Sequence, residues 1–250
     1  MILMVHGGGW RRGDKAMRGV IESKIARWLP RGFIVISTNY RMRPDTPPLQ
    51  QAQDVARAQA VAHDGAAKWG GDAAGWFILM GHSAGSHLVA LLSAEPSLVT
   101  AQGARPWLGT ILLDSGSLDV VQTMRAGHFP LYDQAFGADP ADWLAASPLQ
   151  QMRGRIVPFL AVCSSSRLVS CPQAQAFVRK AESFGSRASV LPEDLSHAEI
   201  NQQLGLPSDY TGAVERFIAS LDPAVADRLD EQAARIAALP VVISRQASVR

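Results

Sequence analysis

The 250-residue chain lacks the features that mark membrane or nucleic-acid-binding proteins. Its apolar opening, MILMV, stops at His6 and three glycines, so it is too short for a signal-peptide core or a bilayer span and is predicted to be a strand. Lysine and arginine form no dense run, and the net charge is only +2. Neither nucleic acid nor an anionic membrane surface is therefore expected as a partner. These absences favour a small-molecule partner and leave the cellular compartment open.

Cysteine is also scarce, with only Cys163 and Cys171 in the chain. A zinc site would need further ligands, and none can be placed near this pair. Neither a metal nor an organic cofactor is expected. A local disulfide and a reduced pair are equally compatible with the sequence.

The chain does contain an alternation of short apolar runs and amphipathic helical stretches. Continuous apolar runs are typical of parallel strands that are buried on both faces. The predicted strands are residues 2–5, 33–38, 76–80, 108–114, 156–162 and 188–191. Apolar spacings of three and four residues, with helix start signals, predict helices near residues 21–29, 55–62, 84–92, 172–184 and 209–221. The pattern predicts one α/β domain with a mostly parallel sheet and helices on both faces.

Three segments are expected within this organisation. Residues 1–221 are predicted to form the α/β domain. Residues 115–150, rich in glycine, proline, aspartate and aromatic side chains, are predicted to form a partly irregular, cap-like insertion over the strand ends. Residues 222–250 are predicted to form a C-terminal tail that begins as a helix and includes a β-like VVIS segment.

One short motif points to covalent chemistry. Residues 81–85, GHSAG, match the pattern G-x-S-x-G between a predicted strand and a predicted helix. Ser83 is the candidate nucleophile on this sharp turn. Larger side chains at Gly81 or Gly85 would collide with the neighbouring strand or helix. The backbone N–H of Ala84, at the helix start, is expected to point at a developing oxyanion.

A second glycine-rich motif follows the first predicted strand. The HGGGW stretch at residues 6–10 is an HGGG-type loop, whose free N–H groups complete an oxyanion hole opposite such a turn. Gly8 and Gly9 are the predicted donors, together with Ala84. A phosphate-binding loop is disfavoured because neither G-x-x-x-x-G-K-[ST] nor G-x-G-x-x-G with a later acidic residue occurs.

With these motifs, NYR at residues 39–41 and a late histidine, the chain resembles the α/β-hydrolase superfamily. Within it, the chain is similar to HGGG-bearing esterases related to hormone-sensitive lipase and to acetyl or feruloyl esterases, with kynurenine formamidase a near relative. The resemblance covers residues 1 to about 221. It implies a serine hydrolase that forms an acyl-enzyme on Ser83. Such hydrolases usually carry two more strands before the HGGG strand, so we expect that the chain is either a fragment or has a shortened sheet. The exposed edge is a candidate homodimer surface.

A general base must take the proton of the serine, and an imidazole suits this role near neutral pH. His197 lies in LPEDLSHAEIN, after the last predicted strand. The resemblance places the base there, in the order serine, acid, histidine. The other histidines are assigned to the oxyanion loop, to the position beside the nucleophile, to helices and to the insertion: His6, His82, His87, His63 and His128.

The expected acid is missing from its usual loop. Residues 163–171, CSSSRLVSC, contain no carboxylate, and Leu168 and Val169 stand where similar esterases place their acid. We predict Asp119 as the substitute, in preference to Asp114, because it lies further along the loop after the neighbouring strand. An alternative is a dyad in which water or a serine orients the histidine ring, the candidates being Ser164, Ser165 and Ser166.

Trp10, His82 and Tyr132 are candidate substrate-pocket residues. The favoured function is a carboxylesterase that cleaves a small acyl ester. Two alternatives stay open: an amidase that acts on an aryl formamide, and a non-catalytic relative that binds an acyl ligand or a protein partner. The empty acid position motivates the second alternative, because loss of the carboxylate costs such enzymes on the order of 10⁴ in rate. If the loop is defective, an aspartate at position 168 or 169 should raise kcat.

Overall fold

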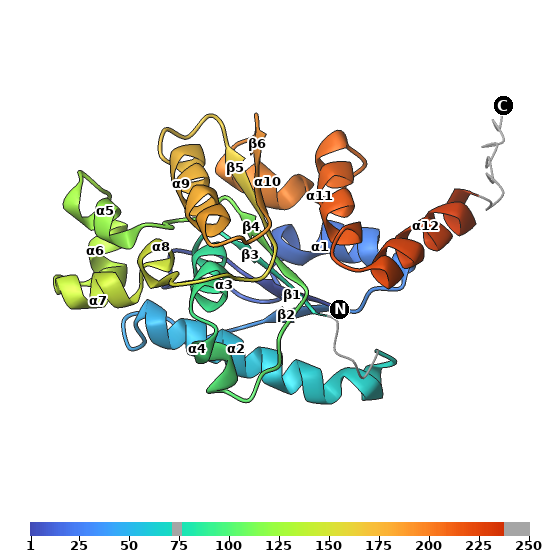
Figure 1. Ribbon diagram of the computed structural model, residues 1–250, viewed down its shortest axis with the longest axis horizontal. Helices are drawn as coiled ribbons and strands as arrows, with labels where there is room; N and C mark the ends of the chain where they lie inside the picture. The colour runs from blue at the N-terminus through green and yellow to red at the C-terminus, as the bar shows by residue number, and fades with distance from the viewer. Residues whose placement is uncertain (72–76, 238–250) are drawn as a thin grey trace, which may run out of the picture.

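The computed structural model describes residues 1–71 and 77–237 (Figure 1). Their strands form one parallel sheet in the order β2-β1-β3-β4-β5-β6. Trp76, in the third predicted strand, and the predicted VVIS segment at residues 241–244 lie outside the described residues. The strands are β1 (Ile2–Val5), β2 (Val35–Thr38), β3 (Ile78–His82), β4 (Gly109–Leu113), β5 (Phe159–Ser164) and β6 (Ala188–Glu193).

Alternate side chains of the strands enter two separate cores. In β1, Ile2 and Met4 pack into one core, and Leu3 and Val5 pack into the other. All four are fully buried or nearly so. Because helices cover both faces, a strand needs apolar residues at every position, which explains the unbroken apolar runs of the sequence. The predicted mostly parallel α/β fold is confirmed.

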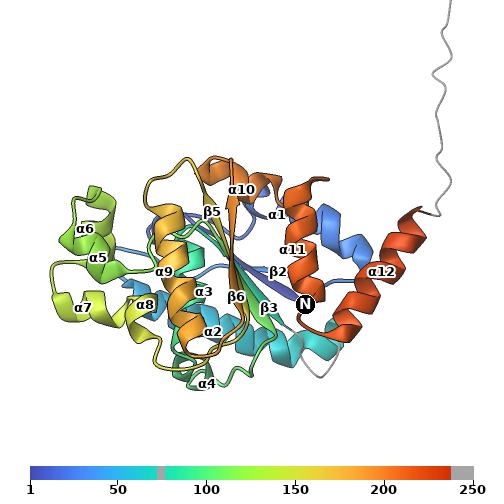
Figure 2. The same cartoon turned by 45° about the horizontal axis from the view of Figure 1, so that its top comes forward.

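Figure 2 shows the sheet between two layers of helices. One layer contains α2 (Pro48–Gly65), α3 (Ala84–Ala94), α4 (Ser97–Thr100) and α9 (Ser170–Ser183). The other contains α1 (Arg18–Trp28), α10 (His197–Gln203), α11 (Asp209–Ala219) and α12 (Pro223–Ala237). Short 3₁₀ turns, η1 (Leu29–Arg31) and η2 (Ala66–Trp69), follow α1 and α2.

The segment predicted as a cap-like insertion lies between β4 and β5 and contains four short helices. In both views α5, α6 and α7 lie beyond one end of the sheet (Figures 1 and 2), and α8 packs against α3. Prolines occupy the first position of three of these helices, where their missing N–H costs no hydrogen bond. The helices are α5 (Val120–Arg125), α6 (Pro130–Phe136), α7 (Pro140–Ala145) and α8 (Pro148–Gln151).

The segment predicted as a C-terminal tail begins with α12. This helix packs against α11 and η1, and its Val225 and Leu229 enter the same core as Ile2 and Met4. Within the described ranges, no helix is both long enough and apolar enough to cross a membrane.

Candidate active site

Ser83 lies on the sharp turn between β3 and α3. Its φ of 56° and ψ of −118° are unusual for a residue with a side chain, and such strain is held only where the surroundings fix it. The Ser83 N–H donates to the Leu113 carbonyl at 3.0 Å, and the Gly116 N–H donates to the Ser83 carbonyl at 3.2 Å. These bonds anchor the turn to the end of β4.

The two glycines of the motif are required by close backbone contacts. A Cβ atom on Gly81 would lie 2.3 Å from the carbonyl oxygen of Gly85. A Cβ atom on Gly85 would lie 2.2 Å from the carbonyl oxygen of Val5 in β1. Strand β3, helix α3 and strand β1 therefore approach too closely for any side chain at either position.

His197, the first residue of α10, joins the serine to a carboxylate. Its Nε2 atom lies 2.9 Å from Ser83 Oγ, and its Nδ1 atom lies 2.5 Å from Asp114 Oδ2. An ionised carboxylate only accepts hydrogen bonds, so Nδ1 is the donor, and Nε2 is free to accept the serine proton. The three side chains thus stand in the order acid, base and nucleophile.

The structure places Asp114, and not the predicted Asp119, beside His197. Asp119 is the N-cap of α5, and its side chain accepts a hydrogen bond from the Gln122 N–H at 3.1 Å. Asp114 is the first residue after β4, which lies between β3 and β5 in the sheet. The end of this strand is already beside the Ser83 turn, so no longer loop is needed. Its φ of 48° marks a sharp local turn of the backbone.

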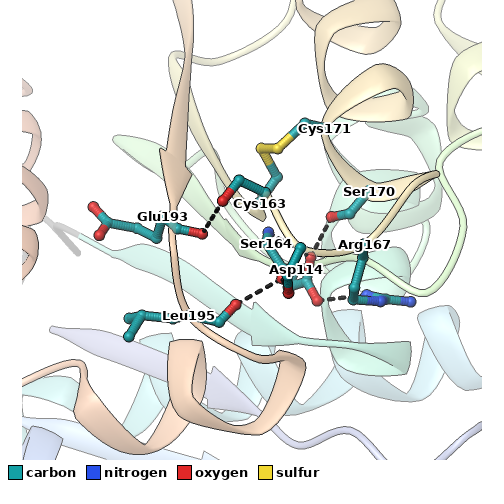
Figure 3. Close-up of a disulfide and its surroundings, with 10 residues drawn as sticks. Asp114, Cys163, Ser164, Arg167, Ser170, Cys171, Glu193 and Leu195 are labelled. Carbon is teal, nitrogen blue, oxygen red and sulfur yellow. Dashed lines mark hydrogen bonds and ion pairs between the residues drawn. A yellow bond between two sulfur atoms is a disulfide. The ribbon is translucent and has the colours of Figure 1, made fainter.

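The carboxylate-free loop surrounds Asp114 with donors, as Figure 3 shows. The Ser164 N–H donates to Asp114 Oδ1 at 3.0 Å, and the Ser170 hydroxyl donates to the same oxygen. The Arg167 guanidinium donates to Oδ2, the oxygen that also faces His197. Instead of supplying an acid, the loop binds one that comes from the neighbouring strand.

These contacts decide the charge of the acid. Burial alone would raise the pKa of Asp114, because its side chain has no solvent exposure. Hydrogen bonds from His197, Ser164 and Ser170, together with the charge of Arg167, oppose burial and hold the pKa well below its usual range. The carboxylate is therefore ionised at neutral pH and can balance a positive charge on the imidazole.

The two cysteines, which the sequence left open, form a disulfide. Cys163 belongs to β5 and Cys171 to α9, so the bond joins both ends of the loop at residues 164–170 that holds Asp114 (Figure 3). In the described part of the chain, no group of histidine, cysteine, aspartate or glutamate side chains is arranged to hold a metal ion.

The glycine-rich loop lies beside the serine. Gly8 and Gly9, with φ of +118° and +62°, line the same cleft as Ser83. Among the described residues, none accepts a hydrogen bond from the N–H of Gly8, Gly9 or Ala84. The Tyr40 hydroxyl anchors the loop by donating to the His6 carbonyl at 2.9 Å. The structure thus leaves the three predicted oxyanion donors unpaired next to Ser83.

A cleft of about 810 Å³ opens over Ser83 and His197. Of the three candidate pocket residues, only His82 lines it. Tyr132 lines a separate pocket between the insertion and the loop that holds Asp114, and its hydroxyl donates to the Gly116 carbonyl at 2.6 Å. Trp10 is only 1% exposed. Its indole N–H finds a partner inside the core, donating to His87 Nδ1 at 3.1 Å, so the ring packs there and not in the cleft.

His82 packs against His197, the predicted base. Its Nε2–H donates to the His197 carbonyl at 2.9 Å, and the centroids of the two rings are 4.6 Å apart. Burial, with a smaller contribution from nearby His197, lowers the pKa of His82 to about 3. His82 is therefore neutral near pH 7 and adds no charge beside the base.

A nucleophile turn after β3, an acid after β4 and a histidine after β6, on a parallel sheet, are the arrangement expected of a serine hydrolase with the α/β-hydrolase fold. Comparison with known proteins agrees. The BD-FAE family model matches residues 1–102. Esterase LipQ of Mycobacterium tuberculosis is 28% identical over 211 residues, which are 79% of this chain and 49% of LipQ. Esterase LipC of the same organism is 26% identical over 204 residues, 76% of this chain and 50% of LipC. The chain thus spans about half the length of the curated relatives it matches.

Solved structures with the same fold are esterases as well. Native esterase 2 of Thermogutta terrifontis superposes with a TM-score of 0.70 at 19% identity, covering 88% of this chain and 80% of that one. Esterase B from Lactobacillus Rhamnosis superposes with a TM-score of 0.69 at 18% identity, covering 93% and 78%. The chain has the α/β-hydrolase fold, and the proteins to which it is similar are esterases, as its motifs predicted.

Proposed function

We propose that this chain is a carboxylesterase-type serine hydrolase that cleaves a small acyl ester through an acyl-enzyme on Ser83. The observation that carries the proposal is the continuous hydrogen-bonded series from Asp114 through His197 to Ser83. The esterases among its relatives and structural neighbours support the same activity.

In the first half of the reaction, Ser83 Oγ attacks the carbonyl carbon of the ester, and its proton passes to Nε2 of His197. The oxygen of the tetrahedral intermediate takes up negative charge, and the N–H groups of Gly8, Gly9 and Ala84 stabilise it. The bond between carbon and the alcohol oxygen then breaks. His197 returns the proton to that oxygen, and the alcohol leaves.

In the second half, a water molecule attacks the acyl group on Ser83 while His197 accepts one of its protons. The acyl carbon releases Ser83 Oγ, which takes the proton back, and a carboxylic acid leaves. The net reaction is ester plus water giving acid plus alcohol. Asp114 stays ionised throughout, keeping Nδ1 of His197 protonated and balancing the charge on the ring.

We infer that residues 1–221 form the hydrolase domain and that residues 115–150 act as its cap. Leu131, in α6 of the cap, lines the cleft and lies against Gly9 of the oxyanion loop. The cap thus forms one wall of the substrate site. The alternative of a non-catalytic relative rests on the absence of an acid from the loop at residues 163–171. Asp114, which follows β4, supplies a carboxylate to His197 and so argues against that alternative.

A covalent probe tests the proposed activity. A fluorophosphonate should label one serine per chain, and peptide mass spectrometry should identify that serine as Ser83. The Ser83→Ala variant should not be labelled. p-Nitrophenyl acetate should give a burst of about one equivalent of nitrophenol if deacylation is the slower half. A folded wild-type protein that neither reacts with the probe nor hydrolyses the ester would contradict the proposal. Comparing phenyl acetate with formanilide separates the esterase from the aryl formamidase.

We also propose that β2 is a pairing edge for a second copy of the chain. Strand β2 pairs with β1 on one side, and no described strand pairs on its other side. Its four residues are only partly buried. An open parallel edge offers unpaired backbone groups to another strand. A dimer by light scattering that dissociates on Ser37→Pro supports this assembly, whereas a monomer at high concentration contradicts it.

A further inference from the structure

The cleft over Ser83 is lined by positive charge. Arg11 and Arg12, which directly follow the HGGGW motif, both line it, and no described lining residue is an aspartate or glutamate. The carboxylate of the site, Asp114, is fully buried behind His197 and is already paired with Arg167. The field in the cleft therefore favours a negatively charged ligand.

The two arginines differ in how they are held. Arg11 is bound to the cap, because its Nη1 atom donates to Gln134 Oε1 at 2.6 Å. Arg12 is fixed only through its backbone, whose N–H donates to the Gly8 carbonyl at 3.1 Å. Its exposed guanidinium makes no hydrogen bond or ion pair with any described residue. Arg12 thus brings five unused donors to the edge of the oxyanion loop.

Two carboxylates lie on the neighbouring elements, but neither forms an ion pair with Arg12, and each is held by other groups. Asp14, two residues after Arg12, accepts hydrogen bonds from Asn39 at 3.0 Å and from the Ala16 N–H at 2.7 Å. Glu22, on the adjacent helix α1, pairs with Arg18 at 2.8 Å. The guanidinium of Arg12 is therefore not paired with a carboxylate of the described chain and is available to a ligand.

We propose that the ester cleaved at Ser83 carries a second, anionic group, a carboxylate, that Arg12 binds. The inference rests on the proposed esterase function and adds the substrate class. A guanidinium fits a carboxylate through two parallel hydrogen bonds, which fixes orientation as well as position. The carboxylate can belong to the acyl part, as in the half-ester of a dicarboxylic acid, or to the alcohol part, as in an ester of a hydroxy acid.

Two matched pairs of esters test the charge preference. p-Nitrophenyl hemiglutarate and p-nitrophenyl pentanoate differ by a carboxylate at the end of the acyl chain. 4-Acetoxybenzoate and its methyl ester differ by a charge on the leaving group. In one of these pairs we expect kcat/KM to be about tenfold higher for the anion, since hydrogen bonds to charged groups are worth about that factor or more. The preference should shrink as salt is added.

Variants of Arg12 test whether this side chain causes the preference for anionic esters. Arg12→Gln should lower the ratio of kcat/KM for the anionic ester to that for its neutral partner about tenfold, and Arg12→Lys should restore part of it. Arg179→Gln is the control, because it removes the same charge from an exposed side chain of α9 that lies outside the cleft lining. It should leave the ratio unchanged. Circular dichroism melting curves check that the variants are folded.

The outcomes separate this inference from the proposed function. Neutral esters that are hydrolysed as well as the anionic ones, or a ratio that Arg12→Gln does not change, overturn the anionic substrate class but leave the esterase. No hydrolysis and no labelling of Ser83 overturn the esterase. Binding of monomethyl glutarate and methyl pentanoate to Ser83→Ala, followed by NMR, then decides the charge preference without turnover. Equal affinities for the two esters overturn it, and tighter binding of the half-ester that Arg12→Gln abolishes supports it.

Discussion

Oδ2 of Asp114 lies 2.5 Å from Nδ1 of His197, although the two residues are 83 positions apart in the chain. The parallel sheet brings them together. Strands β3, β4 and β5 are neighbours, and β6 lies next to β5. Because the strands are parallel, the residues that follow them lie together at the carboxyl ends of the strands. The first residue after β4 and the first residue of the helix after β6 therefore meet beside the Ser83 turn.

The first prediction tests this pair. Asp114→Asn should lower kcat on p-nitrophenyl acetate by about 10⁴, because an amide in this position favours the wrong tautomer of the histidine. Asp119→Asn is the matched control and should change kcat less than about twofold, since asparagine caps a helix as well as aspartate does. Steady-state kinetics on the two purified variants decide between them. Loss of activity in Asp119→Asn, with Asp114→Asn still active, would show that Asp119 is the acid, as the sequence predicted.

Most of the site could be predicted because its signals are local in the sequence. The turn at Ser83 and the loop with Gly8 and Gly9 are contiguous motifs whose glycines have steric reasons. His197 could be placed because it follows the last strand. The sequence could not distinguish Asp114 from Asp119 as the acid. Both follow the same strand, and which of them faces the histidine depends on the path of the few residues of loop between them. Their roles depend on the φ of 48° at Asp114 and on the start of α5 directly after Asp119.

The pocket assignments depend on tertiary contacts that the sequence does not contain. Trp10 follows the oxyanion loop directly, yet its ring lies in the core because His87 accepts its N–H there. Tyr132 is in the insertion beside Leu131, but consecutive helical residues point in different directions. Leu131 therefore lines the Ser83 cleft, and Tyr132 lines the neighbouring pocket.

The second prediction concerns the loop that lacks a carboxylate. From the sequence, Leu168→Asp should raise kcat by restoring an acid. The structure reverses this expectation, because Asp114 already holds His197 and the Leu168 side chain is 94% exposed. We now expect kcat for Leu168→Asp within about twofold of wild type, as for most exposed substitutions. The variant in an Asp114→Asn background is the informative control, and rescue there would show that the loop position can still serve the histidine.

The third prediction concerns the disulfide between Cys163 and Cys171. The two cysteines are 8 positions apart, and closing a loop of this size stabilises a protein by about 2–3 kcal/mol through the unfolded state. Replacing both by alanine should lower the free energy of unfolding by that amount. It should also lower kcat, because the loop that positions Asp114 is no longer tied at both ends. Urea unfolding and ester hydrolysis measure the two effects, and the thiol-reduced wild type should match the variant in both.

The fourth prediction concerns Lys24 in α1, which is 1% exposed. Its Nζ atom donates to the Asn201 carbonyl of α10 at 2.5 Å, and burial lowers the pKa of its amine to about 7. In an unfolded chain a lysine has a pKa of about 10.4. Between these values the unfolded chain binds the proton and the folded chain does not. Folding is therefore penalised fully below pH 7, and the penalty fades as the pH rises towards 10.

Lys24→Met should therefore raise the free energy of unfolding by about 1–3 kcal/mol at pH 6, after allowing for the hydrogen bond lost at the Asn201 carbonyl. The gain should decrease steadily between pH 7 and 10, because wild type recovers stability over that range. Lys15→Met is the control, since it removes an amine from an exposed side chain, and its free energy of unfolding should follow that of wild type. Urea titrations at several pH values measure the difference. A gain that does not vary with pH would mean that the amine stays protonated in the folded chain and that a partner such as trapped water solvates it.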